Sequence, residues 1–145
     1  MALDDLYREV IMDHYRSPRN YGSLDNPTHT ISLTNPFCGD EIILELQVSD
    51  GVVSAAKFTG RGCSISQASA SLMTEAIIGK PVDDAVAMMR GFRRMMRGQL
   101  ENEEEMGDLV ALAGVGKFPV RVKCAVFPWE ALRQALTPEQ LPDDD

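Results

Sequence analysis

Three consecutive segments with alternating apolar residues most constrain the fold of this 145-residue chain. They span residues 29–34, 41–48 and 52–59, and the Asp50-Gly51 pair between the last two is a signal for a tight hairpin turn. Alternation with a period of two is typical of strands that bury one face. The three segments therefore predict a small antiparallel meander, in which the start of one strand lies beside the end of its partner.

Two junctions of this meander carry a cysteine next to glycine. Cys38 and Asp40 enter the second strand on either side of one glycine, and Cys63 follows the third strand after Gly60-Arg61-Gly62. Residues two apart in an extended chain point to the same face, and a glycine between them allows the backbone to fold sharply. Hairpin geometry would therefore bring Cys38, Asp40 and Cys63 to the same end of the sheet.

Segments with helical periodicity surround the meander. Apolar residues recur every three to four positions over residues 3–15, 64–78 and 82–96. A further helix is expected to begin at Phe118-Pro119, because proline suits a first turn, and Pro128 should bend it. We therefore expect an α+β fold, in which a three-stranded antiparallel sheet has an N-terminal helix and several C-terminal helices packed on it.

The C-terminal half carries three further expectations. Residues 98–107 are polar and predict a loop, and Gly114-Val115-Gly116 predicts a break after the segment 108–113. In the last helix, one apolar face is expected from residues at helical spacing, namely Val120, Cys124, Phe127 and Leu132.

Length and charge limit the class of protein. The chain has the size of one domain, which we place over residues 1–138, and residues 139–145 form an acidic tail that is expected to be disordered. A formal net charge of −8 and a pI near 4.7 disfavour nucleic acid as the main partner. No segment is long and apolar enough for a membrane span, and the acidic N-terminus does not resemble a secretion signal. We therefore expect a cytoplasmic protein.

The cysteines suggest a metal more than a disulfide framework. Three is an odd number, and reduced cytoplasmic thiols are commonly free or bound to metal. With Asp40 they offer three thiolates and one carboxylate, the number of ligands that tetrahedral zinc takes. Spacing alone is a weak signal, since the chain has no CxxC pair, and Cys124 is equally well explained as a small buried apolar side chain. Cys63 is expected at a helix N-terminus, where the dipole lowers a thiol pKa.

Two other groups of charged side chains have competing interpretations. His14 lies near the end of the first helix, where a surface or capping role is favoured over metal ligation. A stripe of four arginines on the helix over residues 82–96 and just beyond it indicates either a solvated face or a docking surface: Arg90, Arg93, Arg94 and Arg97.

Four segments resemble one known family. NPFCGD (35–40), GRGCSISQASASLM (60–73) and FPVRVKCAVFPW (118–129) resemble the three ligand segments of the IscU/SufU family of sulfur-acceptor and iron–sulfur assembly proteins. The N-terminal LYREVIMDHYRSPRNYG is also similar to that family, and together these segments cover most of the chain. The SufU branch is the nearer match. Residues 82–106 resemble its insertion, and Lys123 stands where IscU-type scaffolds have a histidine.

This resemblance implies a SufE/IscU-like fold and one zinc ion bound by Cys38, Asp40, Cys63 and Cys124. It implies that Cys38 is the catalytic persulfide acceptor, and that Arg121 is similar to a family arginine associated with recognition of the sulfur donor. The implied activity is that of a zinc-dependent sulfurtransferase, which accepts persulfide sulfur from a PLP-dependent, SufS-like cysteine desulfurase. The sulfur would then pass to a SufB-containing complex for iron–sulfur cluster assembly.

Two alternatives stay open from the sequence. The same four side chains are also those on which an IscU-type scaffold would assemble a transient [2Fe–2S] cluster. Alternatively, the chain is a structural zinc module whose surface, such as the arginine stripe, binds another protein.

Overall fold

The computed structural model describes residues 3–35, 39–99 and 106–137. The chain forms α1 (Leu3–Arg16), β1 (His29–Asn35), β2 (Asp40–Ser49), β3 (Val52–Arg61), α2 (Ser64–Ile77), α3 (Val82–Met96), the 3₁₀ helix η1 (Gly107–Lys117) and α5 (Pro119–Leu136). The predicted α+β fold is therefore confirmed, with each predicted strand and helix close to its expected bounds. The acidic tail predicted at 139–145 lies outside the described residues.

The three strands form the predicted antiparallel meander, in the order β1-β2-β3. The β2–β3 turn places Asp50 at φ 54° and Gly51 at φ 76°, the left-handed conformations that a tight hairpin turn requires. Glu41 lies opposite Arg61 in the β2–β3 register. The start of β2 thus lies beside the end of β3, as the alternating pattern predicted.

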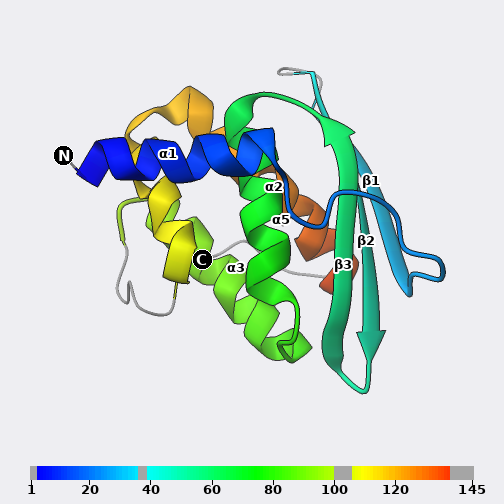
Figure 1. Ribbon diagram of the computed structural model, residues 1–145. Helices are drawn as coiled ribbons and strands as arrows, with labels where there is room; N and C mark the ends of the chain where they lie inside the picture. The colour runs from blue at the N-terminus through cyan, green and yellow to red at the C-terminus, as the bar shows by residue number, and fades with distance from the viewer. Residues whose placement is uncertain (1–2, 36–38, 100–105, 138–145) are drawn as a thin grey trace.

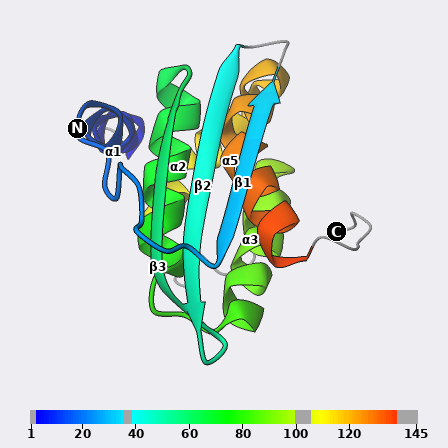
Figure 2. The same ribbon diagram turned by 90° about the vertical axis from the view of Figure 1, so that its right-hand side faces the viewer.

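One face of the sheet is covered by helices. In β2, Ile42, Leu44 and Leu46 are buried while the alternate residues face outward. Helices α2, α3 and α5 lie on the buried face, and α1 crosses α2 rather than the sheet (Figures 1 and 2). The aromatic rings of Phe92 and Trp129 stack with centroids 4.7 Å apart and join α3 to α5.

The break predicted at Gly114-Val115-Gly116 is wrong, because η1 continues through it to Lys117. Leu109, Leu112 and Val115 are all buried in this segment. They lie three residues apart, which is the repeat of a 3₁₀ helix and not of an α-helix. Burial of this three-residue apolar row explains why the two glycines do not end the helix.

Two other local expectations are also corrected. Val120 does not share the buried face of α5, since its side chain is 74% exposed while Cys124, Phe127 and Leu132 are buried. It lies in the first turn of α5, where no other described element covers it. In the predicted polar loop, Met106 is buried against the core and Gly107 begins η1, whereas residues 100–105 lie outside the described part of the chain.

Part of the arginine stripe has a structural role. Arg93 of α3 donates to Glu130 of α5 at 3.0 Å, and Arg133 binds the same carboxylate through two nitrogens. Hydrogen bonds from Arg133, followed by those from Gln134 and the charges of both arginines, hold the pKa of Glu130 below its ordinary value. Arg93 therefore ties two helices together, which neither sequence interpretation anticipated.

A buried hydroxyl also ties α2 to α5. Ser69 donates to the carbonyl oxygen of Ala125 at 2.6 Å and accepts from the indole nitrogen of Trp129 at 3.1 Å. All three residues are fully buried. Because Ala125 follows Cys124, this pair of hydrogen bonds also fixes the position of Cys124 along α5 relative to α2.

His14 differs from its predicted surface or capping role. Its side chain is buried, with the residue only 4% exposed, and its Nδ1 lies 2.7 Å from the Ser71 hydroxyl. That hydroxyl also accepts from the backbone amide of Arg19 at 2.8 Å, so its own proton is available to the imidazole. His14 therefore fixes α1 and the following loop on α2.

Among the helices of the described residues, none combines the length and the apolar composition that a membrane-spanning helix needs.

We expect Ser69→Ala to lower the free energy of unfolding by about 1–3 kcal/mol, because it removes a hydrogen bond to the buried Ala125 carbonyl and the acceptor of the buried Trp129 indole N–H. Urea denaturation followed by tryptophan fluorescence measures the change. The control is Ser54→Ala, which removes a hydroxyl that bonds to a backbone carbonyl at the exposed end of the β2–β3 hairpin. Equal stability of the two variants would contradict this role for Ser69.

We also expect the stability of the protein to fall as the pH drops below about 6.5, the ordinary pKa of histidine. Burial lowers the pKa of His14, assisted by the charge of Arg19 and opposed by those of Glu75, Asp13 and Asp108. The unfolded state therefore binds a proton before the folded state does, and stability is lost between the unfolded and the folded pKa.

Unfolding free energies of the metal-free protein at a series of pH values test this expectation. His14→Asn should flatten the decline, while His29→Asn controls for the other histidine of the chain. A decline of unchanged slope in His14→Asn would assign the pH dependence to other groups.

Candidate metal centre

Three of the four residues singled out as ligands lie together. The sulfur atoms of Cys63 and Cys124 and a carboxylate oxygen of Asp40 are all within 4.8 Å of one another. Asp40 begins β2, Cys63 precedes α2 and Cys124 lies in α5, so three separate elements meet at this point. The fourth residue, Cys38, lies outside the described residues.

The turn before β2 positions the Asp40 side chain. Gly39 has φ 71°, in the left-handed region that favours glycine, and its amide donates to the carbonyl of Asn35 at 2.9 Å. The sharp fold expected at this glycine is therefore present. Asn35 and Asp40 are partners in the β1–β2 register, and Asp40 is 1% exposed.

Cys63 is the N-cap of α2. Its sulfur accepts from the amide of Ser66 at 3.5 Å, as an N-cap side chain normally does at the third helical position. Its own amide donates to Oδ1 of Asp40 at 3.4 Å. In a capping box, a side chain three residues later accepts from that amide. Here Asp40 supplies the acceptor instead, so the helix end and the start of β2 are joined.

The two oxygens of Asp40 have unequal environments. Oδ1 accepts from the Cys63 amide, whereas Oδ2 is buried and has no hydrogen-bond partner among the described residues. The close approach depends on Gly62, since a Cβ there would lie 2.5 Å from Oδ1 of Asp40 and 2.4 Å from Oγ of Ser66. An unpartnered buried carboxylate oxygen is costly, and a bound cation would remove that cost.

The pKa values of Asp40 and Cys63 shift in opposite directions. Burial raises the pKa of Asp40 above its ordinary value, against the opposing effects of the Cys63 amide, the Ser66 side chain and the charge of Arg121. Burial also acts to raise the pKa of Cys63, but hydrogen bonds from the Ser66 amide and the Cys124 thiol outweigh it and lower that pKa. A cation between the two groups would favour the charged form of both.

This donor set fits zinc. Zinc binds thiolate sulfur at about 2.3 Å and carboxylate oxygen at about 2.0–2.2 Å, so that ligand atoms of a tetrahedral site lie roughly 3.5–4 Å apart. The three ligand atoms found here are within 4.8 Å of one another, close to that spacing. Three ligands also leave one corner of a tetrahedron for a fourth donor.

Arg121, Lys123 and Ser66 complete the surroundings. Arg121 and Lys123 are exposed on the first turns of α5, and the charge of Arg121 reaches Asp40. Sequence reasoning did not single out Ser66, whose amide and hydroxyl both contact Cys63. Its position three residues after an N-cap was the signal that could have found it.

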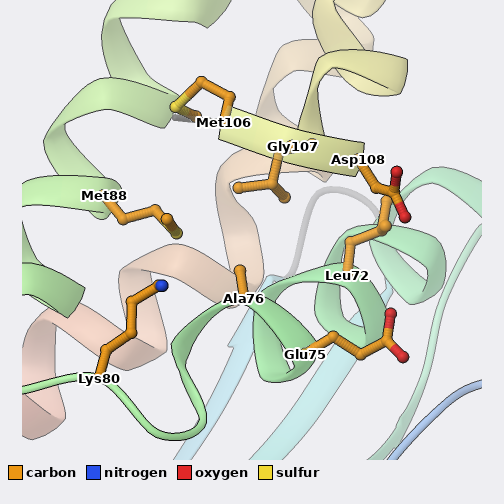
Figure 3. Close-up of a pocket in the computed structure, with 9 residues that line it drawn as sticks. Leu72, Glu75, Ala76, Lys80, Met88, Met106, Gly107 and Asp108 are labelled. Carbon is orange, nitrogen blue, oxygen red and sulfur yellow. The ribbon is translucent and has the colours of Figure 1, made fainter. Parts of the chain in front are cut away.

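A separate pocket lies away from the thiols. It has a volume of about 340 Å³ and lies between α2, α3 and η1, with Glu75, Lys80 and Asp108 as its charged residues (Figure 3). Leu72, which lines it, follows Cys63 by nine residues, or about 14 Å along a helix. None of the residues that line it is a cysteine or a histidine.

Relatives with known names align with most of the chain. It is 48% identical over 139 residues to the zinc-dependent sulfurtransferase SufU of Bacillus subtilis (strain 168), covering 95% of this chain and 94% of that protein. It is 41% identical over 136 residues to the iron–sulfur cluster assembly scaffold protein IscU of Thermotoga maritima, covering 94% of this chain and 96% of the relative.

Solved structures agree with the fold. A crystal structure from Fervidobacterium islandicum AW-1, described as an iron–sulfur cluster assembly scaffold for the SUF system, matches with a TM-score of 0.85 and 36% identity. It covers 89% of this chain and 95% of its own. The profile of the NifU-like N terminal domain family matches residues 6–125. The chain therefore belongs to this family, which corresponds to the IscU/SufU resemblance seen in its sequence.

Proposed function

We propose that the protein is a zinc-dependent sulfurtransferase that accepts persulfide sulfur and delivers it for iron–sulfur cluster assembly. The observation that carries this proposal is the unpartnered, buried Oδ2 of Asp40 beside the thiols of Cys63 and Cys124. A relative of nearly equal length is named a zinc-dependent sulfurtransferase, which supports the same assignment.

Cys38, Asp40, Cys63 and Cys124 would hold the zinc ion. When bound, zinc would keep its cysteine ligands deprotonated and, having no redox chemistry, would not promote their oxidation. Cys38 is joined to Asp40 through Gly39 alone, so covalent geometry keeps their Cα atoms within about 7 Å. This short connection supports Cys38 as the fourth ligand.

Cys38 is also the best candidate for the sulfur acceptor. Cys124 is buried in α5, and Cys63 is held as the N-cap of α2 by the Ser66 amide. Covalent modification of either sulfur would disturb a packed helix or a helix end. The remaining thiol is therefore the one that can accept sulfur with the least structural cost.

The transfer itself conserves atoms and electrons. The Cys38 thiolate attacks the outer sulfur of a persulfide on the donor cysteine, forming a new S–S bond as the donor's S–S bond breaks. The donor sulfur leaves as a thiolate, and the proton stays on the transferred sulfur. The products are a Cys38 persulfide and a reduced donor cysteine, so no external oxidant or reductant is needed.

The donor would be a SufS-like cysteine desulfurase, whose PLP belongs to that partner, and the recipient would be a SufB-containing assembly complex. Arg121 and Lys123 are exposed beside Cys124 in an otherwise acidic protein, and they would meet the approaching donor first. Arg121 is the residue we assign to partner recognition, because its charge also reaches Asp40 within the site. Local positive charge of this kind accelerates association with an acidic partner surface.

A scaffold for a transient [2Fe–2S] cluster is the second candidate. Relatives at 42% and 41% identity are named iron–sulfur cluster assembly scaffold proteins, and this is the observation that favours it. The same donor set would have to bind iron and sulfide. Among the described residues, however, no histidine belongs to the group of Asp40, Cys63 and Cys124.

For the acceptor, we expect one additional sulfur atom on Cys38 after incubation with a desulfurase and cysteine. Rapid alkylation followed by peptide mass spectrometry locates the added mass of one sulfur atom, about 32 Da. Cys38→Ser should lose the label and retain most of its zinc. A label found on Cys124 instead would overturn the assignment of Cys38 and favour the scaffold type.

For the metal, we expect Asp40→Asn to weaken zinc binding by at least about tenfold, because it removes the charge of a ligand. Glu41→Gln is the matched control, since Glu41 is the next residue and its exposed carboxylate pairs with the exposed Arg61. Competition with a chromogenic chelator measures both affinities. Unchanged zinc affinity in Asp40→Asn would remove Asp40 from the ligand set.

A further inference from the structure

The Ser66 side chain lies at the centre of the contacts around the candidate metal centre. Its hydroxyl oxygen is 3.1 Å from the carbonyl oxygen of Cys63 and 3.8 Å from the sulfur of the same residue. It also lies near the Asp40 carboxylate, because a Cβ at Gly62 would come close to both Oγ of Ser66 and Oδ1 of Asp40. A hydrogen bond from the Ser66 side chain acts to lower the pKa of that carboxyl. Ser66 is 3% exposed, so water does not compete for these contacts.

A hydroxyl has only one proton to donate, and two acceptors compete for that of Ser66: the Cys63 carbonyl and the Asp40 carboxylate. Hydrogen bonds to charged acceptors are stronger than those to neutral carbonyls. When Asp40 is ionised, its carboxylate is therefore preferred over the neutral carbonyl of Cys63. The hydroxyl then acts together with the Cys63 amide, which already donates to Oδ1.

The packing around Gly62 restricts the same carboxylate oxygen. A Cβ at Gly62 would lie 2.5 Å from Oδ1 of Asp40 and 2.4 Å from Oγ of Ser66. Both oxygen atoms therefore occupy the space that a side chain at this position would need. Oδ2, in contrast, is buried without a partner among the described residues. One oxygen of Asp40 therefore has a backbone donor, and the other has none among the described residues.

We propose that Ser66 is a positioning residue, which with the Cys63 amide holds Oδ1 of Asp40 so that the carboxylate offers a metal ion Oδ2 alone. This inference rests on the zinc site of the proposed function. One-oxygen coordination keeps the number of ligands at four, which zinc prefers. A carboxylate that can rotate offers both oxygens, and a fifth ligand atom suits metals of higher coordination number.

The test uses zinc affinity and the visible spectrum of the cobalt(II)-substituted protein. Ser66→Ala should weaken zinc binding about 10–100-fold, the usual effect of losing an outer-shell partner. It should also reduce the intensity of the cobalt ligand-field bands, since five-coordinate cobalt absorbs more weakly than four-coordinate cobalt. Ser64→Ala, which removes a hydroxyl from the same helical turn, should leave both measurements unchanged.

A matched pair keeps the test valid if the alanine variant does not fold. Ser66→Thr retains the hydroxyl and Ser66→Val replaces it with a methyl group of similar size. The threonine variant should keep the four-coordinate cobalt spectrum, and the valine variant should lose it. A purely structural role would lower the stability of the metal-free valine variant but leave its loaded spectrum unchanged, and that result would overturn the inference.

Failure of this inference is distinguishable from failure of the proposed function. If the wild-type protein binds neither zinc nor cobalt, both are wrong. If the wild type binds zinc and Asp40→Asn loses it, while the Ser66 variants keep the wild-type affinity and spectrum, only the positioning role of Ser66 is wrong.

Discussion

The hydrogen bond from the Cys63 amide to the Asp40 carboxylate is the contact on which the rest of the site depends. It joins the start of β2 to the first turn of α2, and it satisfies an amide that a helix end leaves open. It also commits one carboxylate oxygen to the protein and leaves the other buried without a partner. The same contact that stabilises the fold therefore creates a local cost of burial, which a cation would offset.

The third element of the site is positioned by helix packing. Cys124 lies in α5. The Ser69–Ala125 hydrogen bond fixes the position of this helix relative to α2, and the stacking of Trp129 on Phe92 fixes it relative to α3. The ligand atoms come from residues far apart in the chain, so they meet only after the sheet and the helices have packed. Metal affinity and folding stability are then linked, because a site of this kind does not exist in the unfolded chain.

The sequence predicted most of what depends on local pattern. Alternating strands and the Asp50-Gly51 turn determine the meander, and hairpin geometry then places Asp40 near Cys63. Cys124 could be added only through the resemblance to a family, because helical periodicity explains a buried cysteine equally well. The burial of His14 was not predictable, since it depends on Ser71, a hydroxyl 57 residues away in the chain. A local pattern carries no information about such a partner.

The family includes relatives named as sulfurtransferases and as scaffolds, so the fold alone does not separate the two activities. The difference must lie in a few side chains at the shared site. In this chain the residue before Cys124 is Lys123, an exposed cation, where a neutral histidine would be a further nitrogen ligand. An ammonium group does not bind metal, and it repels a second cation. A group of one carboxylate and two thiols without a histidine, as found among the described residues, therefore supports the proposed zinc-dependent transfer over the assembly of a pair of iron ions.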